Sequence, residues 1–508
     1  MTISPAQRLA VIVSALLALF LGAMDALVVS AAMPTIVAEL GGLHLYSWVY
    51  SAYLLARAVS LPVFGKLADL YKSRNLFITA IGLFIVSSVL AGSAFNMIAL
   101  IIARAFQGIG AGAIFALVYV VLADISPPQS RGRTLSLASS VWGIASVLGP
   151  TLGGFVVTYF SWRWIFFINI PLGLFSLWGI RAYGVELRVK KDKVSMDIAG
   201  VASLSIAILA FLFAFLLGGR NYDWSSSLII GLLILSGVSI LAFSAVEHRA
   251  TDPLLSIKFF RLRGFSTGNL ASFLSSFAIF SMFAYAPLFI QGAQARSPME
   301  VGVAMLSLSL GWSLGALALG QFIDRIGRKG TAVAGAVCLM AGCAVTLTFT
   351  PASSIYCIFI DLFLIGIGMG WVALSTLMVV QSCLDEKDLG VATSSNQFAR
   401  TLGGAVGVGI CGSFIAARFS NLLEAMRTAD LLRHIPTRLS EAGFGQVESL
   451  LRPEVQATMP EALRDMVQNA VVEGVAGVFW TVSVAAGLCV LLCLLMPGAK
   501  KKTKKAAI

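Results

Sequence analysis

The sequence predicts an all-helical integral membrane protein, and three observations support this fold class. Of its 508 residues, 58% are hydrophobic and 12% are charged, whereas soluble domains average about 25% charged residues. Apolar runs long enough for a helix to cross a bilayer recur along the chain. Basic residues gather in the short segments between these runs, as is typical of polytopic membrane proteins.

The apolar runs divide the chain into fourteen expected membrane-spanning helices. Their predicted ranges are 9–36, 46–65, 76–94, 97–122, 134–159, 164–182, 197–217, 226–246, 265–291, 299–320, 331–350, 354–379, 391–417 and 472–496. The first run has no small-residue cleavage site after it, so we interpret it as a span and not as a removed signal peptide. The segment 418–471 mixes apolar and charged residues at helical spacing, which predicts short amphipathic helices at the outer membrane face.

The distribution of basic residues predicts the orientation of the chain. They concentrate in alternate connections, such as 66–74, 181–193 and 249–263, and in the tail 497–508, while the short connections between them hold few. The positive-inside rule therefore places both termini in the cytoplasm, in a multi-pass protein of the cytoplasmic (inner) membrane. The lysines of the tail are expected to contact anionic lipid.

Several other classes of protein are excluded by the same composition. The net charge of +12 lies in loops between spans, so a nucleic-acid partner is not indicated. The seven cysteines and three histidines show no spacing typical of a metal site. The chain has neither a phosphate-binding GxxxxGK[ST] stretch nor a recognisable nucleophile and base. We therefore expect no catalytic site, no metal and no enzyme activity.

Charged residues inside the predicted spans are the first candidates for function. They are Asp25, Arg57, Arg104, Asp361 and Arg400. A charge in the bilayer core costs about 2.5–3.5 kcal/mol on insertion scales, so such a residue is normally buried against a partner or water. Arg104 is accompanied by Gln107 and by three glycines at 108, 110 and 112, which allow another helix to approach closely. This pattern predicts a buried polar site, the alternative being an arginine that only joins two helices.

A loop motif occurs twice and indicates an internal repeat. GKLADLYKSR (65–74) and GQFIDRIGRK (320–329) both follow an apolar run and precede another. Repeats of six helices are typical of transporters. The second copy follows the tenth span, so two helices are inserted between the halves. We predict an N-terminal half at 1–183, an inserted pair with its linkers at 184–263, and a C-terminal half at 264–508.

Four further motifs add to the repeat. They are MDALVVSAAMP (24–34), RAFQGIGAGA (104–113), SVLGPTLGG (146–154) and WRWIFFINIPLG (162–173). In this order and on these helices they resemble the motifs of the major facilitator superfamily, and specifically its fourteen-helix drug:proton antiporter branch. The resemblance covers most of the chain except 418–471 and the tail. The first loop motif departs from the family, with Leu70 at a usual arginine and Lys72 at a usual glycine.

The resemblance implies which of the buried charges serve proton coupling. Helices one, two and four line the same cavity in this family, so Asp25 is expected to face two arginines, Arg57 and Arg104. Because the ionisation of a carboxylate depends on neighbouring charge, we predict that Asp25 carries the proton and that Arg104 modulates it. Asp361 is predicted as a second titrating residue. The alternative is a fixed ion pair between the first and fourth helices.

Conformational roles are predicted for the two loop motifs and the fifth helix. These residues are Gly65, Asp69, Arg74, Gly149, Pro150, Gly153, Gly154, Asp324, Arg325 and Arg328. Proline bends a helix and small residues allow close packing, so the fifth helix is expected to move against the other half. The candidates for the substrate cavity are Gln107, Trp142, Tyr285, Trp312 and Arg400.

The function that the resemblance implies is proton-coupled antiport. Small amphipathic or toxic compounds would be exported by alternating access, with the proton gradient as the energy source, no cofactor and a monomer as the functional unit. The expected partners are a small-molecule substrate, protons and membrane lipid. One alternative is a facilitator or proton symporter for a small metabolite or lipid-like substrate. An alternative of another class is a membrane sensor or scaffold.

Overall fold

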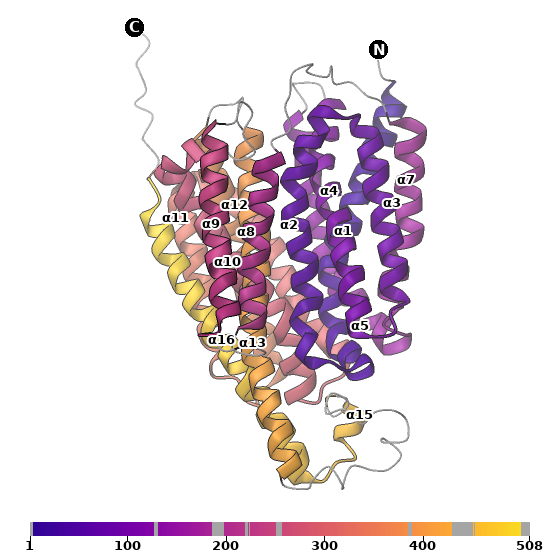
Figure 1. The fold of residues 1–508 in the computed structure, drawn as a ribbon, viewed down its shortest axis with the longest axis vertical. Helices are drawn as coiled ribbons and strands as arrows, with labels where there is room; N and C mark the ends of the chain where they lie inside the picture. Colours follow the sequence, from indigo (N-terminus) through magenta and orange to yellow (C-terminus); the bar gives the residue numbers. More distant parts are fainter. Residues whose placement is uncertain are drawn as a thin grey trace.

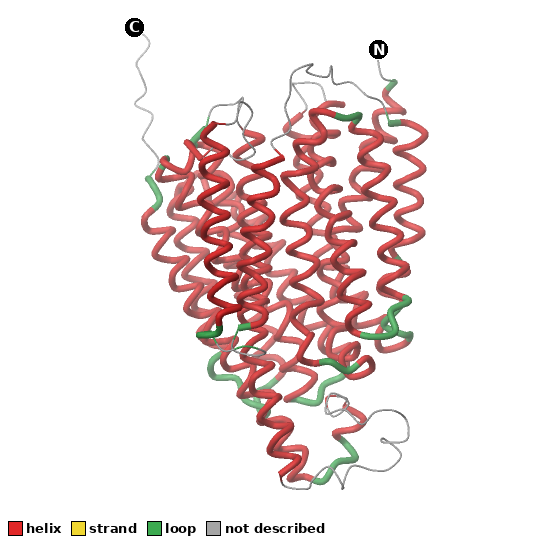
Figure 2. The backbone as a smooth tube through the Cα atoms, in the orientation of Figure 1, coloured by secondary structure: helices red, strands yellow, loops and turns green. Residues whose placement is uncertain are grey.

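The computed structural model describes residues 4–125, 131–184, 198–218, 222, 224–249, 257–384, 389–428, 451 and 453–498. Within them the chain forms a bundle of long helices joined by short loops (Figure 2). The all-helical fold class is therefore confirmed.

The first half of the bundle follows the predicted spans closely. Its helices are α1 (Pro5–Leu40), α2 (Tyr46–Leu70), α3 (Ser73–Gly92), α4 (Met97–Ile125), α5 (Arg131–Tyr159), α6 (Trp164–Phe167) and α7 (Asn169–Tyr183). A short 3₁₀ turn, η1 (Leu43–Leu45), joins α1 to α2. The predicted sixth span is interrupted between α6 and α7. Pro171 has no N–H to donate to the carbonyl of Phe167, which explains the interruption.

Two helices follow that pack against each other, α8 (Ile198–Leu217) and α9 (Ser227–Arg249). Besides α9, α8 contacts α2 and α13 (Leu389–Thr428). The pair is seen in front of the second half in Figure 1. The division of the chain into domains at 183 and 263 remains a prediction.

The second half begins after η2 (Ile257–Arg261). Its elements are α10 (Arg263–Leu288), the π-helical turn η3 (Phe289–Ala293), α11 (Pro298–Thr346), α12 (Ile355–Ser382), α13, α15 (Pro453–Gln456) and α16 (Glu461–Leu495). Tight packing holds α11 to α12, and α10 to both α13 and α16.

The predicted loop between the tenth and eleventh spans is a kink inside α11 and not a separate loop. The kink lies at Gly327, with φ 78° and ψ 160°, a conformation open almost only to glycine. Lys72 occupies the equivalent position in the first motif, with φ −59°. Next to it, Tyr71 also leaves the helical conformation, with φ −114°. Glycine therefore allows the second copy to turn at one residue, whereas the first copy uses two.

The segment 418–471 differs from its prediction where the structure describes it. α13 continues to Thr428 and α16 starts at Glu461, so both extend beyond the predicted spans 391–417 and 472–496. The two helices project together at the end remote from the termini (Figure 1), and Arg418 pairs with Glu473 at 3.5 Å. The helical spacing continues past the expected ends, so α13 and α16 are longer than predicted, and the separate helix described between them is the four-residue α15. Residues 429–450 lie outside the described residues.

Twelve of the described helices are long and apolar enough to cross a membrane. The fourteen-helix count is not established by this criterion, because α2 and α8 do not meet it. α2 contains Arg57 and several tyrosines and serines, which lower its hydropathy. α1 starts and α16 ends at the same end of the bundle (Figure 1).

Contacts between the halves lie from the middle of the helices to the end remote from the termini. Elements α1 with α10, α2 with α13, and α5 with α11 form this junction. Tyr46 donates to the Ala284 carbonyl at 2.6 Å, and the Ser146 and Ser313 hydroxyls are 2.7 Å apart. The site described below lies beside this junction.

Candidate functional site

Three glycines of α4 set its distance from neighbouring helices. A Cβ at Gly112 would lie 2.6 Å from the Arg57 carbonyl oxygen on α2, and one at Gly110 would lie 2.9 Å from the Phe84 nitrogen on α3. A Cβ at Gly108 would meet the Tyr53 carbonyl oxygen. The prediction of close helix approach is therefore confirmed, with α4 held between α2 and α3.

Arg104 projects from α4 into a fully buried ion pair with Asp25 of α1. Arg104 Nη1 lies 2.5 Å from Asp25 Oδ2, and the two side chains are 1% and 0% exposed. The guanidinium also covers the Tyr53 ring, at 4.0 Å from its centroid. A cation and an anion so far from water each depend on the other for charge compensation.

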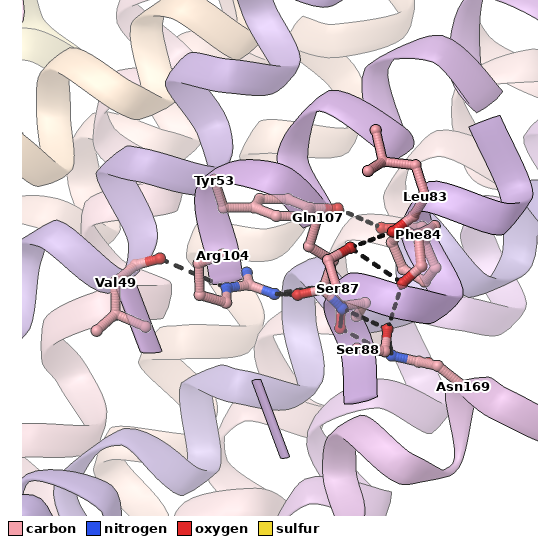
Figure 3. A network of polar contacts seen from close by, with 11 residues as sticks. Val49, Tyr53, Leu83, Phe84, Ser87, Ser88, Arg104, Gln107 and Asn169 are labelled. Atoms are coloured by element: carbon pink, nitrogen blue, oxygen red, sulfur yellow. Dashed lines mark hydrogen bonds and ion pairs between the residues drawn. The ribbon is translucent and has the colours of Figure 1, made fainter. Parts of the chain in front are cut away.

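Neutral amides complete the environment of the carboxylate. Gln107 donates to Asp25 Oδ1 at 2.8 Å and accepts from Arg104 Nη1 at 2.7 Å. Asn169 donates to the same Oδ1 at 3.0 Å. Ser88 accepts from both amides, at 2.9 Å and 3.3 Å. Figure 3 shows Arg104, Gln107, Ser88 and Asn169 converging from three helices. The carboxylate is therefore fixed by donors from α4 and α7.

Two members of this network, Ser88 and Asn169, were not predicted. Asn169 is the amide in WRWIFFINIPLG, an apolar segment in which a polar side chain needs a buried partner. This requirement could have identified Asn169 as a site residue from the sequence. Ser88 gave none, because serine is common in membrane helices and often bonds its own helix, as Ser88 also does to Phe84.

Arg57 is directed elsewhere, although it was predicted to face Asp25. Its guanidinium lies over Phe115, at 3.9 Å from the centroid, and 5.6 Å from the centroid of Trp142. No ion pair of Arg57 is found among the described residues. Of the two arginines considered from the sequence, Arg104 is the one paired with the acid.

Asp361 lies on α12, is 4% exposed, and is separated from Arg400. Among the described residues neither of its carboxyl oxygens has a hydrogen-bond partner. A Cβ at Gly342 of α11 would lie 3.4 Å from its Oδ1. Arg400 of α13 instead lies 5.5 Å from the Trp312 centroid. The acid is therefore placed against α11, near Gly342.

The residues predicted for the substrate cavity fall into two groups. Trp142 and Trp312 stack across the junction, with centroids 6.4 Å apart, and both are partly exposed. Gln107 and Tyr285 have no exposed surface. Gln107 belongs to the ion-pair network, and Tyr285 donates to the Val408 carbonyl at 2.7 Å.

The glycines of α5 pack on two sides. A Cβ at Gly153 would lie 2.5 Å from the Val28 carbonyl oxygen of α1, and one at Gly149 would lie 3.0 Å from the Leu27 Cβ. On the other face, a Cβ at Gly154 would lie 2.9 Å from the Gly302 Cα of α11. The Pro150 carbonyl also faces Gly302. This helix therefore joins its own half and contacts the other through backbone.

The loop motifs are described in part. A Cβ at Gly65 would meet nothing within 4 Å, Arg328 is exposed, and Arg74 donates to the Arg181 carbonyl at the end of α7. The side chains of Asp69, Asp324 and Arg325 lie outside those that the structure describes. The conformational roles of the loop motifs remain predictions.

Comparisons with known proteins agree with this architecture. The family model described as Major Facilitator Superfamily matches residues 15–408. The chain is 30% identical to the multidrug transporter protein MdtP of Bacillus subtilis, over 98% of this chain and 95% of the relative. Multidrug resistance protein 3 of the same organism is 30% identical, with 97% and 96% covered. The efflux pump dotC of Dothistroma septosporum is 30% identical, with 96% and 84% covered.

Solved structures show the same fold at low identity. A bacterial homolog of the human lysosomal transporter Spinster, in an inward-facing and unoccupied conformation, superposes with a TM-score of 0.64 at 14% identity. The superposition covers 97% of this chain and 98% of that one. With the helical bundle, the family match and the relatives in agreement, the chain belongs to the Major Facilitator Superfamily and is a membrane transport protein, not an enzyme.

Proposed function

We propose that the chain is a proton-coupled antiporter that exports small amphipathic compounds by alternating access. It crosses the membrane fourteen times with both termini in the cytoplasm, acts as a monomer, and uses the proton gradient with no cofactor. The names of its relatives, a multidrug transporter, a multidrug resistance protein and an efflux pump, support export of such compounds.

The observation on which the proposal depends is the buried Asp25–Arg104 ion pair. Protonation of Asp25 removes the negative charge that compensates Arg104. It also turns the carboxylate that accepts hydrogen bonds from Gln107 and Asn169 into a neutral carboxylic acid. Loss of one partner from a buried pair costs about 3–5 kcal/mol. Moving a two-state equilibrium from 1:99 to 99:1 takes about 5.5 kcal/mol. One proton at Asp25 therefore has an effect of the right size to bias the conformation of the transporter.

The test is proton flux in vesicles reconstituted with the purified full chain and a trapped pH dye. Ethidium, tetraphenylphosphonium and 1-naphthylacetate serve as cargo probes. We expect at least one probe to drive protons in the opposite direction to its own movement. Asp25→Asn should lower this proton-coupled flux at least tenfold, because the amide cannot release a proton.

Glu39→Gln is the matched control. Glu39 is also an acid of α1, but it lies at the outer part of the bundle, paired with Arg163 at 2.5 Å and partly exposed. This variant should retain flux. Retained coupling in Asp25→Asn at normal membrane expression would eliminate Asp25 as the carrier, and protons moving in the same direction as cargo would indicate symport.

A further inference from the structure

Arg57 and Arg400 come from opposite halves of the transporter and flank one aromatic cluster. Arg57 of α2 lies over Phe115 and near Trp142, while Arg400 of α13 lies near Trp312. Trp142 contacts Phe115 at 5.4 Å and stacks on Trp312 at 6.4 Å, with an interplanar angle of 29°. The two cations and the three rings therefore form a continuous row across the junction.

The two cations in this row lack anionic partners among the described residues. Arg57 is 5% exposed, and its Nε and Nη1 have no hydrogen-bond partner there. Arg400 Nε is likewise without a partner, and Arg400 Nη1 makes one long bond, 3.4 Å, to Gln397. The polar side chains beside Arg57 are the phenols of Tyr53, which hydrogen-bonds it, and Tyr119, and neither is a carboxylate.

Both guanidinium groups border the same pair of stacked rings, because Arg57 Cζ lies 5.6 Å from the Trp142 centroid and Arg400 Cζ lies 5.5 Å from the Trp312 centroid. Asp25 is already held by Arg104 and two amides, and Asp361 lies against α11. Unpaired like charges in a low-dielectric interior are unfavourable, so an anion between Arg57 and Arg400 would be favoured over a cation.

The rings indicate what kind of anion fits. Trp142 and Trp312 are partly exposed although they lie mid-helix between the halves, so part of each ring is accessible to a flat apolar group. Guanidinium groups bind carboxylates and sulfonates through paired N–H donors. We propose that Arg57 and Arg400 form a two-point anion clamp for amphipathic aromatic acids. This deepens the proposed function by naming its substrate class, and it rests on the junction being the transport site.

The experiment compares two probes with one skeleton. Radiolabelled 1-naphthylacetate carries a carboxylate, and 1-naphthylacetamide is its neutral analogue. Equilibrium binding to the purified full chain should be at least tenfold tighter for the acid. Arg57→Gln and Arg400→Gln should each weaken binding of the acid at least tenfold and leave the amide within twofold. Arg400→Lys, which keeps the charge but loses the paired donors, should fall between.

Arg296→Gln is the control, because Arg296 is a partly exposed arginine that pairs at 3.1 Å with Glu300 of α11. It should leave both affinities unchanged. Unchanged amide binding and the wild-type elution volume show that the clamp variants are folded. The clamp would be overturned if the wild type bound acid and amide with equal affinity, or if it bound the acid without saturation. It would also be overturned if the ratio of acid to amide affinity stayed the same in Arg57→Gln and Arg400→Gln.

Failure of the clamp and failure of antiport give different results. Acid-selective binding without any exchange for protons would leave the clamp standing and overturn the proposed antiport. Proton-driven export of ethidium by a chain that does not prefer the acid would support antiport and overturn the clamp.

Discussion

Each oxygen of Asp25 has a defined donor, and Gln107 connects the donors to one another. Its amide nitrogen bonds Asp25 and Ser88, while its carbonyl oxygen accepts from Arg104. One neutral side chain therefore satisfies both members of the ion pair. The sequence offered both Arg57 and Arg104 as neighbours of Asp25, and the rotation of each helix decides which of them reaches it. Depth is readable from residue spacing, but the rotation of one helix against another is not.

At this scale we expect Gln107→Leu to destabilise the protein strongly. The change leaves Asp25 and Arg104 each short of one hydrogen bond, and an unpaired buried group costs about 1–3 kcal/mol. The expected loss in free energy of unfolding is therefore about 2–6 kcal/mol. Thermal melting of the detergent-solubilised protein measures it.

The control for Gln107→Leu is Ser203→Ala. The Ser203 hydroxyl bonds only to carbonyls of its own helix in the contacts described, at 2.7 Å and 3.1 Å. Its replacement should leave the melting temperature close to wild type. A Gln107→Leu protein that melts like Ser203→Ala would show that Asp25 and Arg104 do not need the amide.

Single residues determine where a helix is interrupted or bent. Pro171 divides the sixth span, and Gly327 bends α11 within one residue. The spans themselves were predictable, because apolar runs of this length have few alternatives in a membrane. Their ends were less so: α13 and α16 continue outward wherever helical spacing persists without a breaker.

Gly327→Ala isolates the backbone contribution at the kink. Nothing lies within 4 Å of a Cβ at this position, so the side chain itself meets no obstacle. The conformation at φ 78° is nevertheless closed to alanine, and we expect a loss of about 1–3 kcal/mol in unfolding free energy.

Gly237→Ala on α9 is the matched control, since its Cβ also meets nothing within 4 Å and its backbone is helical. That change should be neutral or stabilising by about 0.4–1 kcal/mol. Equal melting temperatures for the two variants would mean that α11 accommodates a different kink.

For the whole molecule, the halves meet through close backbone approaches, polar contacts and stacked aromatic rings. Gly154 faces Gly302, and Ser146 faces Ser313. The duplicated loop motif predicted a six-helix repeat, which stays a prediction, and the motif order indicated the family that the comparisons confirm. The pairing of α5 with α11 was expected only in general terms, and the aromatic row with its two arginines was not foreseen. Contacts between segments this far apart in sequence depend on packing that no local pattern encodes.

Alternating access requires the α5–α11 contact to open, and a reversible crosslink tests this directly. The Ser146 and Ser313 hydroxyls are 2.7 Å apart, so cysteines at both positions should lie within the reach of a disulfide. We expect the double variant Ser146→Cys with Ser313→Cys to lose at least nine-tenths of its proton-coupled flux after oxidation. The disulfide would hold α5 and α11 together until it is reduced. Flux should return with dithiothreitol.

Each single variant, oxidised in the same way, controls for the seven native cysteines. Full flux in a quantitatively crosslinked protein would mean that the halves do not separate at this contact, and the rocking motion would have to be replaced by movement within one half.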